Sequence, residues 1–592
     1  MTTDKSSSFA LTRDSEKLIN VALGKEKADL AIVNARLVNV FTKEILDNFS
    51  VSIKGKWIAA VGSDLKYSIG AKTEVIDAGG KTIIPGLIDG HTHLAWLYTA
   101  YEFLKYAMKG GTTTIITETM EPFPVSGYDG VVDFLDSLKD QPIKIFSTAP
   151  FMASISDAAR DISIEALKKL LSREDIIGLG ESYWQSVLQQ PDLSLPILRE
   201  TLLSGKSLEG HSAGAGIKKL NAYIATGISS CHEPIKTDEV LERLRLGLYV
   251  MIREGSIRRD LEEISKIKDF DIDLRRLVLV SDGVEPEDLL KKGYMEFIVQ
   301  KAIDCGFDPI TAIQMATLNV AEHFSLDGII GGIAPGRYAD LLIIPDERTI
   351  KAQYVISNGQ LIAQNGNLLK QPRKHAFAKQ SMTSVHLTRK LNASDFAVRM
   401  EKAASKVEVR IINMVTDLVS SELNMMLPVV NGEIIQDVSS DIKKIAAVDR
   451  THNPGKTFTG LIKGFCLDKG AFACSASWDT TDIIVVGAND VDMALAVNRI
   501  FDIQGGAVVC VNGKIEAELS MPVFGILSDL PMEQIAERTK NIKNQLSELG
   551  VPFPAPLLSL IALTGAAIPF LRICEEGLVN LKNGKTVGII SS

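Results

Sequence analysis

The stretch that decides the fold is Pro85-Gly86-Leu87-Ile88-Asp89-Gly90-His91-Thr92-His93. An apolar, extended run precedes it, and Pro85 and Gly86 stop that run before two histidines appear two positions apart. Alternate residues of a strand share a face, so His91 and His93 point the same way. Two imidazoles on one strand face are costly to bury unless they are paired or bind a metal. We therefore expect this motif to supply two ligands to one metal ion.

Further polar residues occur later in the chain, each just after the end of an apolar run. They are Glu181, His211, His232, Glu233 and Asp282. A lone histidine or acid at a strand end is more often structural, but the order His-x-His, Glu, His, His, Asp indicates a metal-dependent site. Histidine and carboxylate ligands without thiolate suit zinc, manganese or iron, and a carboxylate can bridge two ions. The sequence therefore predicts a site for two divalent metal ions.

Apolar runs alternate with helical patterns throughout residues 86–329. The runs that read as strands are 112–116, 143–146, 176–179, 227–230, 249–252 and 277–280. Alternating βα units over about 250 residues are typical of a (β/α)8 barrel, whose chemistry lies at the C-terminal ends of its strands. The expected fold class is therefore α/β, with the candidate ligands gathered at one mouth of the barrel.

Short strands separated by turn residues flank the barrel region on both sides. They fall within residues 25–85 and 330–370, after an N-terminal extension at 1–24. The first group ends before it could close a sandwich, so we expect both groups to build one small β-sandwich domain into which the barrel is inserted. After a polar, basic linker, residues 385–592 read as a separate C-terminal α+β domain.

Composition narrows the class of protein. The chain has 592 residues, 46% of them hydrophobic, and its net charge of -9 comes without a basic block, which argues against a nucleic-acid partner. Six scattered cysteines and a polar N-terminus favour a cytoplasmic protein. The uncharged segment 549–571 contains four prolines, so we expect a buried, partly helical segment and no membrane span.

The order and context of the candidate ligands resemble the amidohydrolase superfamily, and the whole chain is similar to the adenine deaminase family. The stretches that carry the resemblance are 85–93, Gly110-Gly111-Thr112-Thr113-Thr114, 210–214, 220–225, 232–233, 315–319, Ile333-Ala334-Pro335-Gly336-Arg337, 463–465 and 488–498. The last two lie in the C-terminal region, which resembles a domain particular to adenine deaminases.

The resemblance implies a hydrolase of purine salvage and adenine catabolism that converts adenine to hypoxanthine and ammonia. The implied ligands are His91, His93 and Asp282 for one metal ion, His211 and His232 for the second, and Glu181 as the bridge between them. Manganese is the expected metal, with iron or zinc as alternatives. A homo-oligomer, and specifically a dimer, is the expected assembly.

The resemblance also implies roles in the reaction. A metal-activated water would attack C6 of adenine, with Asp282 as general base and then acid. Glu233 would donate a proton to the ring nitrogen, and we expect Glu121 and Ser182 to contact the substrate.

The chain departs from the family pattern at three places. The differing stretches are Leu94-Ala95-Trp96-Leu97, where members usually have Ile-Glu-Ser-Ser, Glu118-Thr119-Met120-Glu121, where they have Asp-Pro-His-Glu, and Trp478-Asp479-Thr480-Thr481-Asp482, where they have His-Asp-Ser-His-Asn. All predicted metal ligands survive these changes. Two alternatives stay open: an amidohydrolase of another amino-substituted heterocycle or a cyclic amide, and a catalytically silent relative kept for binding.

Overall fold

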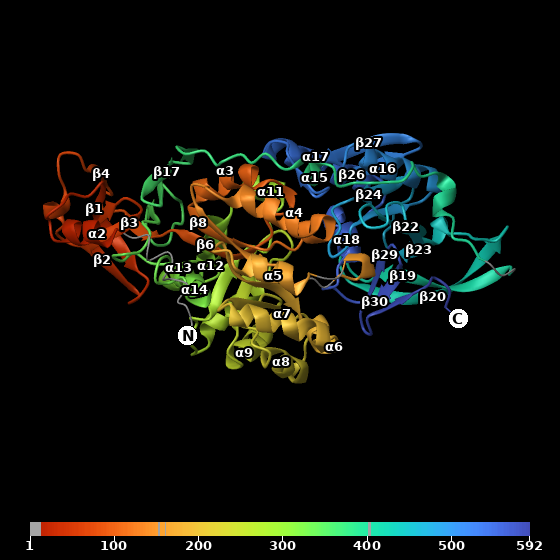
Figure 1. Ribbon diagram of the computed structural model, residues 1–592, viewed down its shortest axis with the longest axis horizontal. Coiled ribbons are helices and arrows are strands. Elements are labelled where there is room, and N and C mark those ends of the chain that lie inside the picture. The colour runs from red at the N-terminus through yellow and green to blue at the C-terminus, as the bar shows by residue number, and fades with distance from the viewer. Residues whose placement is uncertain (1–13, 152–153, 160–161, 401–403, 592) are drawn as a thin grey trace.

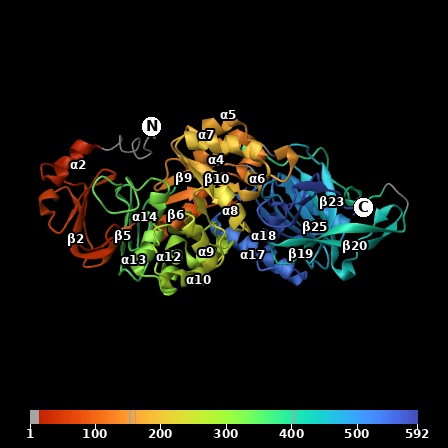
Figure 2. The ribbon, with the colours of Figure 1, turned by 90° about the horizontal axis from the view of Figure 1, so that it is seen from below.

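The structure is a computed structural model that describes residues 14–151, 154–159, 162–400 and 404–591 (Figure 1). A β domain, a central barrel and a C-terminal domain lie in a row, as both views show (Figures 1 and 2). Of the extension expected at residues 1–24, residues 1–13 lie outside the described residues, and α2 (Ser15–Ala22) follows them.

The β domain is one sheet built from both flanks of the barrel. Its strands are β1 (Leu30–Asn39), β2 (Glu44–Lys54), β3 (Trp57–Gly62), β4 (Glu74–Asp77) and β5 (Thr82–Pro85) before the barrel, and β15 (Leu341–Ile344), β16 (Tyr354–Ser357), β17 (Gln360–Gln364) and β18 (Asn367–Leu368) after it. The two groups join where β15 pairs antiparallel with β5, Leu342 opposite Ile84. Apolar residues of both groups, among them Ile32, Ile53 and Ile343, form one core.

Within the described residues, eight strands form the barrel. They are β6 (Leu87–Thr92), β8 (Thr112–Thr117), β9 (Lys144–Ala149), β10 (Ile176–Tyr183), β11 (Ser207–His211), β12 (Ser230–Cys231), β13 (Tyr249–Arg253) and β14 (Leu277–Val280). β6 to β11 make one parallel ladder and β12 to β14 a second. Backbone hydrogen bonds join the two ladders at both of their edges. Ser229 N, before β12, donates to Leu208 O of β11, and Asp282 N, after β14, donates to His91 O of β6, each at 3.0 Å. The predicted (β/α)8 barrel is confirmed.

Helices cover the outside of the barrel (Figure 1). They are α3 (Ala100–Gly110), α4 (Pro122–Leu138), α5 (Ile164–Leu171), α6 (Trp184–Gln189), α7 (Pro191–Leu203), α8 (Ile217–Ile224), α9 (Thr237–Arg245), α10 (Leu261–Ile264), α11 (Pro286–Lys292), α12 (Met295–Asp304), α13 (Pro309–Met315) and α14 (Leu318–His323). The chain passes from β5 to β6 at Gly86, where a Cβ would lie 2.1 Å from Thr113 Oγ1. A side chain at that position would therefore push the connection away from the start of β8.

The C-terminal domain is a nine-stranded sheet with helices against it. Its strands are β19 (Lys406–Met414), β20 (Ser420–Val430), β21 (Glu433–Ile434), β22 (Ile442–Asp449), β23 (Thr457–Lys463), β24 (Ala471–Cys474), β25 (Asp482–Gly487), β26 (Gly506–Val511) and β27 (Lys514–Ser520). Its principal helices are α16 (Asp490–Asp502) and α17 (Met532–Glu548), and a small sheet of β29 (Leu571–Cys574), β30 (Gly577–Asn580) and β31 (Lys585–Val587) follows. The expected α+β domain is therefore present.

The uncharged segment near the C-terminus contains α18 (Pro556–Ile561), whose residues are all buried, as the sequence predicted. Among the described residues, no helix combines the length and the hydropathy that a bilayer span requires.

The segment directly after the His-x-His motif joins the barrel to the C-terminal domain. There β7 (Leu97–Tyr98) pairs with β28 (Leu527–Ser528), Leu97 opposite Leu527. Two side-chain contacts support this pairing: Met532 N donates to Glu102 Oε2 at 3.1 Å, and Tyr106 OH donates to Glu533 Oε1 at 2.5 Å. The C-terminal domain is therefore held beside the mouth of the barrel.

Candidate metal centre

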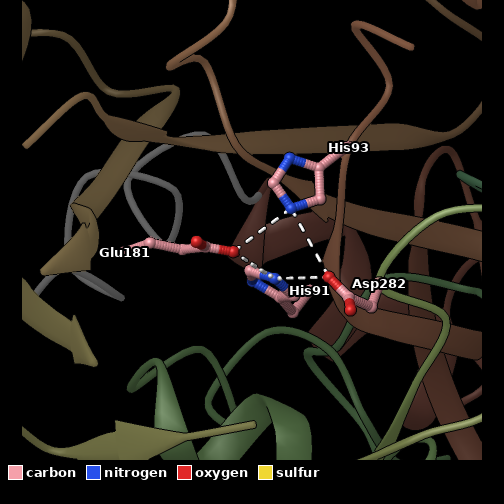
Figure 3. Close-up of side chains that lie close together, drawn as sticks. All are labelled: His91, His93, Glu181 and Asp282. Atoms are coloured by element: carbon pink, nitrogen blue, oxygen red, sulfur yellow. Dashed lines mark hydrogen bonds and ion pairs between the residues drawn. The ribbon is translucent and has the colours of Figure 1, made fainter. Parts of the chain in front are cut away.

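His91 and His93, at the C-terminal end of β6, point toward Glu181 and Asp282 (Figure 3). His91 Nε2 lies 3.3 Å from Glu181 Oε1 and 3.4 Å from Asp282 Oδ1. His93 Nε2 lies 3.2 Å and 3.5 Å from the same two oxygens. Ligands bound tetrahedrally at about 2.1 Å from one ion lie about 3.4 Å apart. The observed spacing is therefore that of a metal-binding group.

A second group forms around the same glutamate. Glu181, His211 and His232 bring their ligand atoms together, with His232 Nε2 3.3 Å from Glu181 Oε1. Because Glu181 Oε1 belongs to both groups, it is the atom that could bridge two ions. Glu233 lies directly against this second group, its Oε1 2.7 Å from His232 Nε2 and 3.1 Å from His211 Nε2.

Two acids after β8 lie behind the histidines. Glu118 Oε1 is 3.5 Å from His91 Nδ1, and its Oε2 accepts a hydrogen bond from Thr148 Oγ1 at 2.7 Å. Glu121 Oε1 is 2.5 Å from His93 Nδ1. Carboxylates in this position orient a metal-binding histidine and raise its basicity. Glu121, predicted to contact substrate, thus has a histidine ligand as its immediate partner, although it also lines the cavity described below.

Arg253 is a site residue that the sequence analysis missed. It ends β13, and its Nη1 lies 3.3 Å from Asp282 Oδ2 and 3.7 Å from Glu233 Oε1. Its Nη2 lies 3.3 Å from Asp260 Oδ2. The sequence does contain a signal for Arg253: it directly follows the apolar run 249–252, just as each predicted ligand follows an apolar run.

The electrostatics of the site reflect a surplus of carboxylates. Burial alone would lower the pKa of His91, but Asp282, Glu118 and Glu181 raise it well above its ordinary value. Burial alone would raise the pKa of Glu233, but His211, His232 and Arg253 lower it to about 2. Glu233 therefore stays ionised and attracts positive charge, which divalent ions would supply.

A cavity of about 320 Å³ opens at these groups, between the barrel and the C-terminal domain. The barrel lines it with His93, Glu121, Glu181, Tyr183, His211, His232, Glu233, Arg253 and Asp282, together with Trp96, and the C-terminal domain with residues 416–419, 476–479 and 567–569. Ser182 does not reach the cavity: it is fully buried, and its Oγ donates to Gly180 O at 3.1 Å. Successive strand residues face opposite sides, so Ser182 points away from the side occupied by Glu181.

A (β/α)8 barrel that carries a His-x-His pair on its first strand, with Glu, His, His and Asp at later strand ends, defines a metal-dependent amidohydrolase. Residues 82–362 match the model of the amidohydrolase family. Residues 417–585 match the model of the adenine deaminase C-terminal domain.

Relatives of known name match along nearly the whole chain. An adenine deaminase of Moorella thermoacetica (strain ATCC 39073 / JCM 9320) is 36% identical over 590 residues, which cover 98% of this chain and 99% of the relative. An adenine deaminase of Clostridium botulinum (strain 657 / Type Ba4) is 35% identical over 584 residues, 97% of each chain. The adenine deaminase of Cenarchaeum symbiosum (strain A) is 33% identical over 588 residues, which cover 98% of this chain and 96% of the relative. The chain belongs to the adenine deaminase family.

Proposed function

We propose that this protein hydrolyses adenine to hypoxanthine and ammonia. The observation that carries the proposal is the pair of ligand groups that share Glu181 Oε1 and open onto one cavity. At about 320 Å³ the cavity is at the small end of ligand pockets, which span roughly 300–1,000 Å³, so it suits a free base better than an extended substrate. The adenine deaminases named above match this chain over nearly its full length.

The donor atoms fit divalent metal ions. His91 Nε2 and Glu233 Oε1 are buried, and neither has a hydrogen-bond partner within the described residues. Histidine and carboxylate donors without thiolate suit manganese, iron or zinc, and we propose two ions per chain, with manganese as the native metal. Ions bound there would lower the pKa of a coordinated water and so supply a nucleophile near neutral pH.

Asp282 is the proposed general base and acid. Its Oδ1 faces His91 and His93, while Arg253 holds its Oδ2. Contacts with the two histidines and Arg253 outweigh burial and lower the pKa of Asp282 well below its ordinary value, so it is ionised and ready to accept a proton. It would return that proton to the departing amino group.

Glu233 is the proposed proton donor to the ring nitrogen. Because its pKa is lowered to about 2, it is ionised at rest and would first take one proton from the attacking water before passing it to the ring. Its Oε2 accepts a hydrogen bond from Ser212 N at 3.1 Å, and its Oε1 faces the histidines of the second ligand group. Ser212 N thus orients the carboxyl group, so that Oε1 faces His211 and His232, which line the cavity together with Glu233.

We also propose a cytoplasmic enzyme that assembles as a dimer. All six cysteines are free, as suits a reducing compartment. The hairpin of β19 and β20 projects at the far end of the C-terminal domain and exposes Met426 and Val430, which are 57% and 53% accessible (Figure 1). Light scattering after size-exclusion chromatography tests the assembly.

The experiment that tests the function follows the ultraviolet absorbance of adenine with manganese-loaded protein, with ammonia release as a second readout. Conversion to hypoxanthine is expected, and Asp282→Asn, the negative control, is expected to abolish it. Protein that holds about two metal ions per chain and leaves adenine unchanged would contradict the proposed substrate and favour another amino-substituted heterocycle. Protein that binds no transition metal would favour a silent relative.

A further inference from the structure

The C-terminal domain places an acid in the cavity wall, in the turn between β24 and β25. Asp479 is 6% exposed and lines the cavity beside Trp478. Its carbonyl oxygen accepts a hydrogen bond from Ser154 Oγ of the barrel, and its Oδ2 accepts one from Ala566 N at 2.7 Å. The turn is therefore tied to both domains at once.

The backbone of Asp479 has a conformation that is uncommon for residues other than glycine. Its φ is 34°, in the left-handed region, where a Cβ is crowded by the backbone. Such conformations persist where surrounding contacts over-determine them, and they gather at functional sites. The bonds to Ser154 and Ala566 provide that constraint here.

The two carboxylate oxygens of Asp479 differ in their contacts. Within the described residues Oδ2 has its bond to Ala566, whereas Oδ1 has no hydrogen-bond partner. Burial raises the pKa of Asp479 to about 7, and the negative charges of Glu181 and Glu121, on the barrel side, add to that effect. Asp479, Glu181 and Glu121 all line the same cavity. A residue that only capped Ala566 N would need neither a free oxygen nor a place in the cavity wall.

The chemistry of a purine base determines what such an acid can bind. If C6 of adenine lies at the two ligand groups, the opposite edge of the ring system, with N3 and N9–H, points into the rest of the cavity. Above pH 7, where Asp479 is mostly ionised, its carboxylate accepts a hydrogen bond from N9–H, and such a charge-assisted bond is roughly twice as strong as a neutral one. A substituent at N9 removes the donor and occupies the space in front of the acid.

We propose that Asp479 determines specificity: its free oxygen accepts N9–H of the bound base, so the site takes free bases in preference to N9-substituted purines. This inference rests on the proposed deamination at C6. It gives the C-terminal domain a direct part in substrate choice, through a residue that touches the substrate from the cavity wall.

The test compares adenine with 9-methyladenine as substrates of the manganese-loaded protein. The kcat/KM of the wild type is expected to favour adenine roughly 10- to 100-fold, the range for a hydrogen bond to a charged group. Asp479→Ala should bring that ratio within about threefold of unity, because only one of the two substrates loses a contact. Asp479→Asn keeps a neutral acceptor and should give an intermediate ratio. The matched control is Asp417→Asn, another acid of the same domain in the cavity wall, and it should leave the ratio unchanged.

Equal losses on both substrates in Asp479→Ala, at wild-type metal content and Tm, would overturn the inference. If that variant does not fold, Asp479→Asn decides, and an unchanged ratio there counts against the role of Asp479. Wild-type protein that converts neither substrate refutes the proposed deamination and this inference with it. Wild-type activity on adenine thus separates a failure of the function from a failure of the inference.

Discussion

Replacing Glu121 by glutamine separates two roles for this acid. Its Oε1 lies 2.5 Å from His93 Nδ1, and this contact sets the ring so that His93 Nε2 faces Glu181 Oε1 at 3.2 Å. From the sequence we expect Glu121 to contact substrate, whereas this geometry places it behind a candidate metal ligand. The first role predicts a change in KM, and the second predicts a change in metal affinity.

The size of the effect follows from the two histidine contacts. Removing a carboxylate partner from a metal-binding histidine typically costs about 10- to 100-fold in metal affinity, or roughly 1.4 to 2.7 kcal/mol. The matched contact, His91 Nδ1 to Glu118 Oε1, is 3.5 Å long against 2.5 Å for Glu121. A hydrogen bond weakens steeply over that difference. We therefore expect Glu121→Gln near the upper end of the range and Glu118→Gln near the lower end.

The assay titrates manganese into metal-free protein against a competing chelator and follows adenine turnover at each free-metal concentration. For Glu121→Gln, the concentration that gives half-maximal activity should rise about 100-fold, while kcat and KM at saturating metal stay within about threefold of the wild type. An unchanged metal requirement together with a KM raised about tenfold would refute the reasoning and return Glu121 to the substrate.

Two further predictions concern buried charges. Arg253→Gln should lower kcat about 100-fold, because Asp282 loses the cation that holds its Oδ2. Arg253→Lys, which keeps a positive charge, should recover part of that loss. Steady-state kinetics of both variants at wild-type metal content would measure the two effects. Asp482 is fully buried, neither carboxylate oxygen has a hydrogen-bond partner within the described residues, and burial with the charges of Glu575 and Asp449 raises its pKa well above the ordinary value. The stability that its proton provides is complete below the unfolded pKa, near 4, and is lost as the pH rises toward the folded pKa. Relative to the wild type, Asp482→Asn should therefore raise the free energy of unfolding more at pH 8 than at pH 5, by about 1 to 3 kcal/mol. The same difference between variant and wild type at both pH values would contradict this.

The barrel and much of the site could be predicted because the relevant signals are local. Residues two apart on one strand share a face, which predicts that His91 and His93 lie together, as they do in the structure. Glu181, at the end of its apolar run, lies where both ligand groups meet. The same alternation, applied to Ser182 beside Glu181, argues against its predicted contact with substrate. Arg253 follows an apolar run as the candidate ligands do, but arginine does not ligate metals, so the ligand pattern does not mark it as part of the site.

The chain by itself determined the alternating strand and helix pattern, the order of candidate ligands and the flanking strands, because each depends on spacing within a few residues or on chain order. Only the tertiary structure decided that Asp479 and residues 416–419 and 567–569 form a wall of the cavity. No periodicity links those residues to His91 or Asp282. Their proximity depends on contacts such as the pairing of β7 with β28, which form only when whole domains pack against each other.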